Sequence, residues 1–137
     1  MKILFVCSRN TGRSPMAEFV MKKLVGEDKN FVIESAAANS TGGEELHEGI
    51  AAKLREENVP YTKHISRPMT AADYEKFDKI VCMDASNVEM VRKICGGDSQ
   101  NKIQMLLETD IPWDKNGFAK TYEDILRGCQ ALINAGD

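Results

Sequence analysis

The sequence lacks a long hydrophobic run and has only 4 prolines and 4 cysteines in 137 residues. A secretion signal wants ~7–15 consecutive apolar residues and a membrane-spanning helix ~20, and neither is found, so we expect a cytoplasmic protein with no membrane partner. The cysteines do not have zinc-site spacing, and in that compartment they are expected to be free thiols with no metal. They are Cys7, Cys82, Cys95 and Cys129.

The sequence also lacks an excess of positive charge. Its 18 Lys and Arg stand against 21 Asp and Glu, a formal net charge of −3, which argues against a nucleic-acid partner. A hydrophobic share of 42% is too high for a disordered chain. Since ~150 residues per domain is usual, residues 1–137 are expected to form a single domain.

Short apolar stretches alternate with stretches of helical periodicity. This alternation predicts an α/β fold, a single three-layer α/β/α domain with a central four-stranded parallel sheet. The expected strands are residues 2–6, 31–35, 79–83 and 102–107. The expected helices are residues 14–26, 46–58, 70–74, 84–96 and 120–134, with a loop at 108–118.

Cap residues mark several helix ends. Ser14 is expected to cap the first helix with Pro15 at its first position, and Gly26 to end it. Asp84 or Ser86 is expected to cap the fourth helix.

Residues 7–14, Cys-Ser-Arg-Asn-Thr-Gly-Arg-Ser, connect the first strand to the first helix. Ligands of parallel sheets bind where such connections lie, and a tight turn into a helix directs backbone N–H groups toward an anion. Those N–H groups, the helix dipole and a nearby arginine all favour the thiolate of Cys7. Arg13 offers a planar fork that matches phosphate oxygens. The pattern predicts a nucleophile beneath a phosphate site.

Three further residues support this loop. Ser14 is expected to donate a hydrogen bond to the Cys7 sulfur, and Asn10 to brace the loop through its side-chain amide. Gly12 is expected to provide an unusual backbone angle.

The block from Phe5 to Glu18 resembles FVCxGNxCRSPMAE, the signature of the low-molecular-weight protein tyrosine phosphatases. The resemblance continues over most of the chain, at Ser35–Ala37, 46–49, 64–68, 77–87 and 118–129. It implies hydrolysis of phosphotyrosine or another aryl phosphomonoester, in a phosphorylated protein or a small molecule, with inorganic phosphate as a product. It implies no cofactor.

The resemblance also implies the roles of the site residues. Cys7 is the nucleophile that forms a phosphocysteine, and Arg13 stabilises the transition state. The expected substrate-binding residues are Ser8, Arg9, Asn10, Thr11, Gly12, Ser14 and Trp113. Trp113 matches an aromatic residue that flanks the substrate, where it can stack on a phosphotyrosine ring.

The sequence departs from the family at the general acid, which the family places in an Asp-Pro-(Tyr/Trp) motif. Here the stretch is Thr109-Asp110-Ile111-Pro112-Trp113-Asp114. Counting back from Phe118 without gaps, the acid position falls on Ile111. Asp110 and Asp114 are the candidates to replace it, and we favour Asp110 as the catalytic acid.

Three residues of the loop also depart from the family. Arg9 replaces a glycine, and Gly12 replaces a cysteine that in many relatives forms a protective disulfide with the nucleophile. Thr11 resembles the arginine-phosphatase branch, which makes phosphoarginine the alternative substrate.

Two further functions stay open. One is a phosphate-binding pseudoenzyme, suggested by Arg9 and the altered acid motif. The other is arsenate reduction, which needs two further cysteines. Cys82 is suitably placed for the first, but Glu89 occupies the position of the second, seven residues later, and Cys95 lies too far along the chain.

Overall fold

The computed structural model describes residues 1–135. Four parallel strands form one sheet in the order β2-β1-β3-β4, so β1 lies inside the sheet. The strands are β1 (Lys2–Cys7), β2 (Val32–Ala37), β3 (Lys79–Cys82) and β4 (Ile103–Met105). The expected four-stranded parallel sheet is confirmed, with a β4 shorter than the predicted 102–107.

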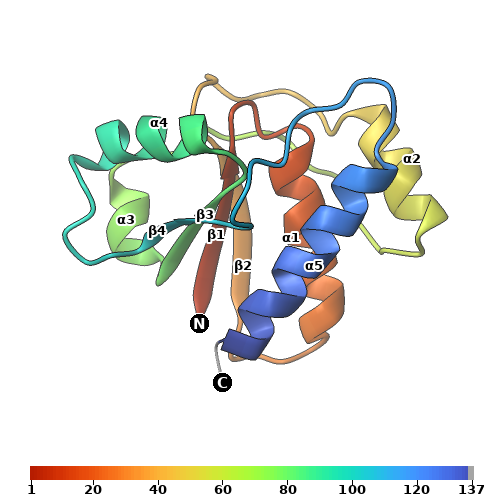
Figure 1. Cartoon of the computed structure of the whole chain (residues 1–137), viewed down its shortest axis with the longest axis horizontal. Helices are drawn as coiled ribbons and strands as arrows, with labels where there is room; N and C mark the ends of the chain where they lie inside the picture. Colours follow the sequence, from red (N-terminus) through yellow and green to blue (C-terminus); the bar gives the residue numbers. More distant parts are fainter. Residues whose placement is uncertain (136–137) are drawn as a thin grey trace.

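Helices cover both faces of the sheet (Figure 1). α1 (Arg13–Val25) and α5 (Ala119–Ala135) pack together on one face, with α2 (Glu48–Glu56) beside α1. α3 (Ala72–Lys76) and α4 (Ala85–Cys95) lie on the other face. The three-layer α/β/α arrangement is therefore confirmed.

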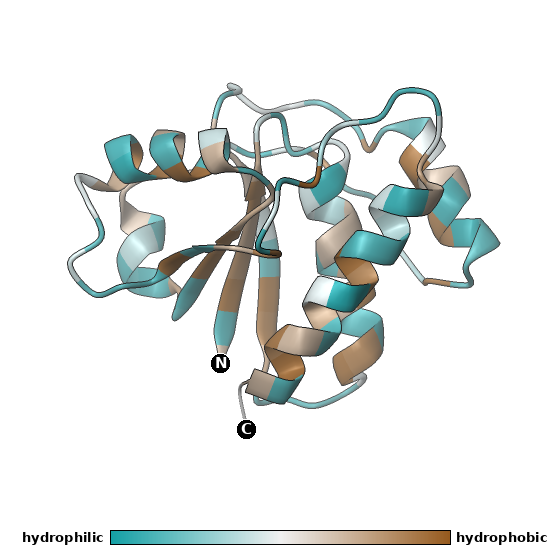
Figure 2. Ribbon diagram, in the orientation of Figure 1, coloured by the Kyte–Doolittle hydropathy of each residue, from teal (hydrophilic) through white to brown (hydrophobic). Residues whose placement is uncertain are grey.

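The apolar residues of β1 alternate between two cores, one on each face of the sheet. Figure 2 shows the apolar strands in brown between the helix layers. Ile3, Phe5 and Cys7 pack with α1 and α5, whereas Leu4 and Val6 pack on the side of α3 and α4. Full burial of the strand on both faces explains why its sequence is a continuous apolar run.

The helix ends partly match the expectations. Gly26 is the C-cap of α1, and Asp84 caps α4 by accepting a hydrogen bond from the Asn87 N–H. The prediction for Ser14 is wrong: α1 begins at Arg13 with Gly12 at the N-cap, so Ser14 lies in the first turn. Its hydroxyl is used inside the loop instead, as described below.

No helix in the described part of the chain is long and apolar enough to cross a membrane.

Candidate active site

The connection from β1 to α1, residues 7–14, lies at the carboxyl end of the sheet, the upper edge in Figure 1. Three of its carbonyl groups accept hydrogen bonds from backbone N–H groups outside the loop. The Cys7 and Ser8 carbonyls accept hydrogen bonds from the Ala38 and Asn39 N–H groups, each at 2.9 Å, and the Thr11 carbonyl accepts one from the His47 N–H at 2.9 Å.

The N–H groups of residues 8–12 find no acceptor within residues 1–135. These donors belong to the loop that lines the pocket at Cys7. Unpaired backbone N–H groups in a loop of this kind can bind an anion. The geometry therefore agrees with the predicted phosphate site.

The Cys7 sulfur is buried and receives two contacts from the first turn of α1. The Ser14 N–H donates to Sγ at 3.4 Å, and the Ser14 hydroxyl lies 3.0 Å from it. Both contacts fix the position of the sulfur beside the first turn of α1.

Asn10 braces the loop from inside, as expected. It is fully buried and has a left-handed backbone with φ 58°, a conformation that asparagine tolerates better than most residues. Its amide nitrogen donates to the Ser14 hydroxyl at 2.8 Å, and its amide oxygen accepts the Arg67 N–H at 3.2 Å. His64 Nε2 lies 2.9 Å from the Asn10 carbonyl.

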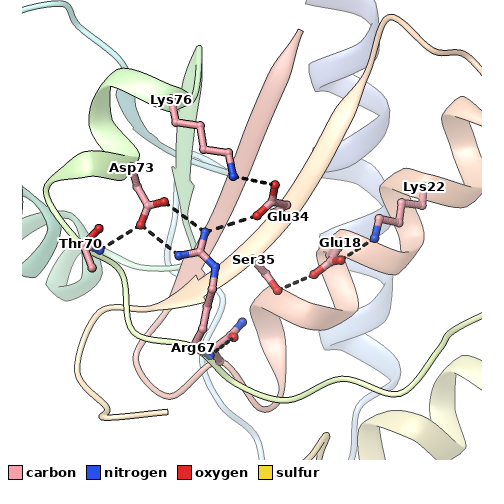
Figure 3. Close-up of polar contacts among 9 residues, drawn as sticks. Glu18, Lys22, Glu34, Ser35, Arg67, Thr70, Asp73 and Lys76 are labelled. Carbon is pink, nitrogen blue, oxygen red and sulfur yellow. Dashed lines mark hydrogen bonds and ion pairs between the residues drawn. The ribbon is translucent and has the colours of Figure 1, made fainter. Parts of the chain in front are cut away.

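Arg67 is itself held by an ion-pair cluster, shown in Figure 3. Its guanidinium donates to both carboxylate oxygens of Asp73, at 3.1 and 3.2 Å, and lies 3.5 Å from Glu34. Lys76 also pairs with Glu34. The backbone segment that supports Asn10 is therefore fixed by side chains from two elements, β2 and α3.

Arg13 is the largest polar side chain near the sulfur and is only 8% exposed. Its Nη1 donates to Asp84 Oδ2 and to the Ile111 carbonyl, each at 2.8 Å. Both partners lie on connections at the same edge of the sheet. They hold one nitrogen of the guanidinium and leave its others for an anion.

Asp84, expected only as a possible helix cap, also bonds to Arg13, which the sequence did not reveal. Burial acts to raise the pKa of its carboxyl, but hydrogen bonds from Arg13, the Asn87 N–H and Ser86 outweigh burial and hold the pKa below its ordinary value. The carboxylate therefore stays ionised beside Arg13. The signal was its position: it follows β3, whose end lies beside the end of β1.

A pocket of about 520 Å³ opens over this loop. It contains seven of the predicted site residues and three that were not predicted. The lining residues are Cys7, Ser8, Arg9, Thr11, Gly12, Arg13, Glu44, Glu45, His47 and Trp113. Asn10 and Ser14 are fully buried and act on the loop through the contacts given above.

Trp113 packs directly on Gly12. A Cβ atom at residue 12 would lie 2.3 Å from Cζ3 of the indole, so contact with Trp113, and not a positive φ, explains the glycine. The backbone of Gly12, with φ −131° and ψ −87°, also lies outside the usual α and β regions, so the unusual backbone angle expected there is present as well. The ring also meets His47 edge-on, with the centroids 5.0 Å apart. Trp113 is 42% exposed and presents an aromatic surface at the pocket.

His47 has a second function beside the pocket. Its Nδ1 accepts the Gly49 N–H at 3.0 Å and so caps α2. Its position in the pocket was not predicted, because a histidine in a loop carries no pattern.

Asp110 lies elsewhere. Its Oδ1 accepts the Ala85 N–H at 2.9 Å, at the first turn of α4, and it is not among the residues that line the pocket. Asp114 turns back on its own loop, where it accepts the Asn116 N–H. Ile111 is fully buried, and its N–H donates to the Met83 carbonyl. The structure thus brings neither candidate acid to the Cys7 pocket.

The other cysteines are remote from this chemistry. Burial raises the pKa of the Cys82 thiol to about 12, and Cys82 packs in the core on the side of the sheet opposite Cys7. Burial also raises the pKa of the Cys95 and Cys129 thiols. No cluster of three or more His, Cys, Asp or Glu residues suited to a metal ion occurs within residues 1–135.

Comparison with known proteins agrees with this geometry. Residues 2–135 match the family model described as low molecular weight phosphotyrosine protein phosphatase. The chain belongs to this family. The expected enzyme class, protein-tyrosine-phosphatase, is therefore confirmed.

Individual relatives are similar over nearly their whole length. The low molecular weight protein-tyrosine-phosphatase PtpA of Staphylococcus aureus is 34% identical, over 96% of this chain and 91% of the relative. The crystal structure of SP-PTP, the phosphatase of the same class from Streptococcus pyogenes, has a TM-score of 0.91 at 35% identity, over 98% and 91% of the two chains. YfkJ from Bacillus subtilis has a TM-score of 0.92 at 29% identity, over 98% and 93%.

Proposed function

We propose that this pocket hydrolyses aryl phosphomonoesters, phosphotyrosine among them, with Cys7 as the nucleophile. The thiolate attacks phosphorus and the bond to the leaving oxygen breaks, which forms a phosphocysteine. Water then attacks phosphorus, the P–S bond breaks, and inorganic phosphate and the Cys7 thiolate are released. The observation that carries this proposal is a buried sulfur in a loop whose N–H groups, at residues 8–12, have no acceptor within residues 1–135.

Arg13 and the loop N–H groups would hold the three equatorial oxygens of the phosphoryl group, where charge spreads in the transition state. Ser8, Arg9, Thr11 and Gly12 line the bound phosphate or its approach, with Asn10 and Ser14 behind them. Trp113 would stack on the aromatic ring of the substrate.

Asp110 as the acid of the first step stays a prediction. Its carboxylate is held at the start of α4, so the geometry gives it no direct support. An aryl leaving group of low basicity departs readily without a proton from the protein. Phosphotyrosine releases the more basic phenolate of tyrosine, so its hydrolysis depends more on a proton donor.

The substrate is a phosphorylated protein or a small aryl phosphate, and the enzyme acts on it in the cytoplasm. All four cysteines are free, as expected in a reducing compartment. We propose no nucleic-acid partner, since the net charge of −3 gives no basic surface excess.

The test compares wild type with Cys7→Ser on an aryl phosphate, with phosphoarginine as a second substrate. We expect turnover in wild type, none in Cys7→Ser, and faster hydrolysis of the aryl phosphate. Faster release of phosphate from phosphoarginine would change the substrate, and the pocket position of Thr11 would then carry that assignment. Phosphate binding without turnover in wild type would show a pseudoenzyme.

A further inference from the structure

The pocket contains carboxylates on the side formed by residues 43–45, which we call the wall segment. Glu44 and Glu45 both line it, while Asp110 and Asp114 do not. A reaction that ends with water attacking phosphorus needs a proton acceptor near that water. Glu44 and Glu45 of the wall segment are therefore the candidates for this proton acceptor.

The backbone of the wall segment is held firmly. The Gly43 N–H donates to the Ser66 carbonyl, the Ser66 N–H donates to the Glu44 carbonyl, and the Glu44 N–H donates to the Ser66 hydroxyl, at 2.8, 2.8 and 2.9 Å. Glu45 adds an antiparallel bridge to Ile65. Ser66 is followed in the chain by Arg67, whose N–H donates to Asn10 and whose guanidinium pairs with Asp73.

Glu44 is paired with a residue of the nucleophile loop itself. Its Oε2 lies 2.7 Å from Nη2 of Arg9, and the glutamate side chain is 41% exposed, open to water. The second step needs a group that accepts a proton from water, and a carboxylate that lines the pocket and is open to solvent is such a group.

We propose that Glu44 is the general base that activates water for hydrolysis of the phosphocysteine. This inference rests on the proposed function. The water oxygen forms a bond to phosphorus, one water proton passes to a Glu44 oxygen, and the P–S electron pair returns to Cys7 as a thiolate. Arg9 orients the carboxylate and balances its charge before the proton arrives.

The experiment is rapid mixing of Glu44→Gln with p-nitrophenyl phosphate. Nitrophenolate leaves without needing a proton, so the first step is insensitive to this change. We expect a burst close to one nitrophenolate per enzyme, followed by steady turnover about 10²-fold or more below wild type. Acid quenching should trap phosphate on Cys7.

Glu48→Gln is the matched control. Glu48 also pairs with an arginine at 2.7 Å, Arg55, but it does not line this pocket. We expect it to show wild-type turnover and no accumulated phosphocysteine. The burst itself shows that Glu44→Gln is folded. The change that phosphate causes in the fluorescence of Trp113, the single tryptophan, provides a second check on the site.

Three results overturn the inference: Glu44→Gln within about twofold of wild type, slow turnover without trapped phosphocysteine, or a burst from Glu45→Gln in its place. These outcomes differ from failure of the proposed function. In that case wild type itself releases no nitrophenolate and Cys7 is never phosphorylated.

Discussion

The guanidinium of Arg13 lies 2.8 Å from the carboxylate of Asp84, with both side chains largely buried. The pair joins the first turn of α1 to the start of α4. An arginine fixed in this way needs no rearrangement before it meets a phosphoryl group, which is the preorganisation that stabilises a transition state.

Asp84→Asn should therefore impair both catalysis and stability. We expect turnover of an aryl phosphate to fall about tenfold to a hundredfold, because Arg13 loses its charged partner. Unfolding free energy should fall by about 1.5–3 kcal/mol, the usual size for a hydrogen bond to a charged group. Denaturant unfolding at neutral pH and steady-state kinetics measure the two effects.

The stability loss should depend on pH. Because the folded pKa of Asp84 lies below its ordinary value of about 3.9, its contribution is present above that value and is lost as pH falls through the folded pKa. Wild type and Asp84→Asn should thus converge below pH of about 3.9. A difference that stays constant into acid would contradict this account.

Gly12→Ala should displace the indole of Trp113, since the new Cβ would lie 2.3 Å from the ring. Trp113 is the single tryptophan, so its emission should move to longer wavelength as the ring becomes more exposed. We expect a cost of about 1 kcal/mol from overpacking. Adding Trp113→Ala should remove that cost, giving a non-additive pair. Unchanged emission in Gly12→Ala would count against the contact.

The role of Asp110, structural or catalytic, can be determined by comparing two variants. As a cap for α4, its loss in Asp110→Ala should cost about 0.5–2 kcal/mol, whereas Asp110→Asn keeps an acceptor for the Ala85 N–H and should lose less. A catalytic acid would lose turnover in both variants alike. From the geometry we expect the cap pattern in thermal unfolding, and kinetics with phosphotyrosine would detect the acid.

Alkylation should distinguish Cys7 from the other thiols. Burial raises the pKa of Cys82, Cys95 and Cys129. Brief iodoacetamide treatment at neutral pH should therefore give one label, on Cys7, and inorganic phosphate should slow it. Peptide mass spectrometry locates the label, and Cys7→Ser should remain unlabelled. Preferential labelling of Cys82 would show that the loop does not activate Cys7.

The parts of the site that could be predicted lie next to each other in the chain. Cys7, Arg13 and Ser14 share one short loop between an apolar strand and a helix, so local spacing determines their geometry. Asn10 could be predicted for the same reason. The strand–helix alternation likewise predicted the sheet.

The parts that could not be predicted depend on contacts between distant segments. Glu44 and Arg9 meet only because residues 43–45 pair with Ile65 and Ser66, and a loop with no periodicity does not reveal that pairing. Asp110 lies one residue before the position that contacts Arg13, and Ile111 occupies that position. From this segment, the main-chain carbonyl of Ile111, and not the Asp110 carboxylate, reaches Arg13.

Ile111 also holds the segment that contacts Arg13. Its side chain is fully buried, its N–H is bonded to Met83 and its carbonyl to Arg13. Lifting this residue would expose apolar surface worth about 1.5–3 kcal/mol and release both bonds. The segment around Ile111 is therefore held against lifting, and its carbonyl keeps the Arg13 guanidinium in place as a phosphorylated side chain approaches.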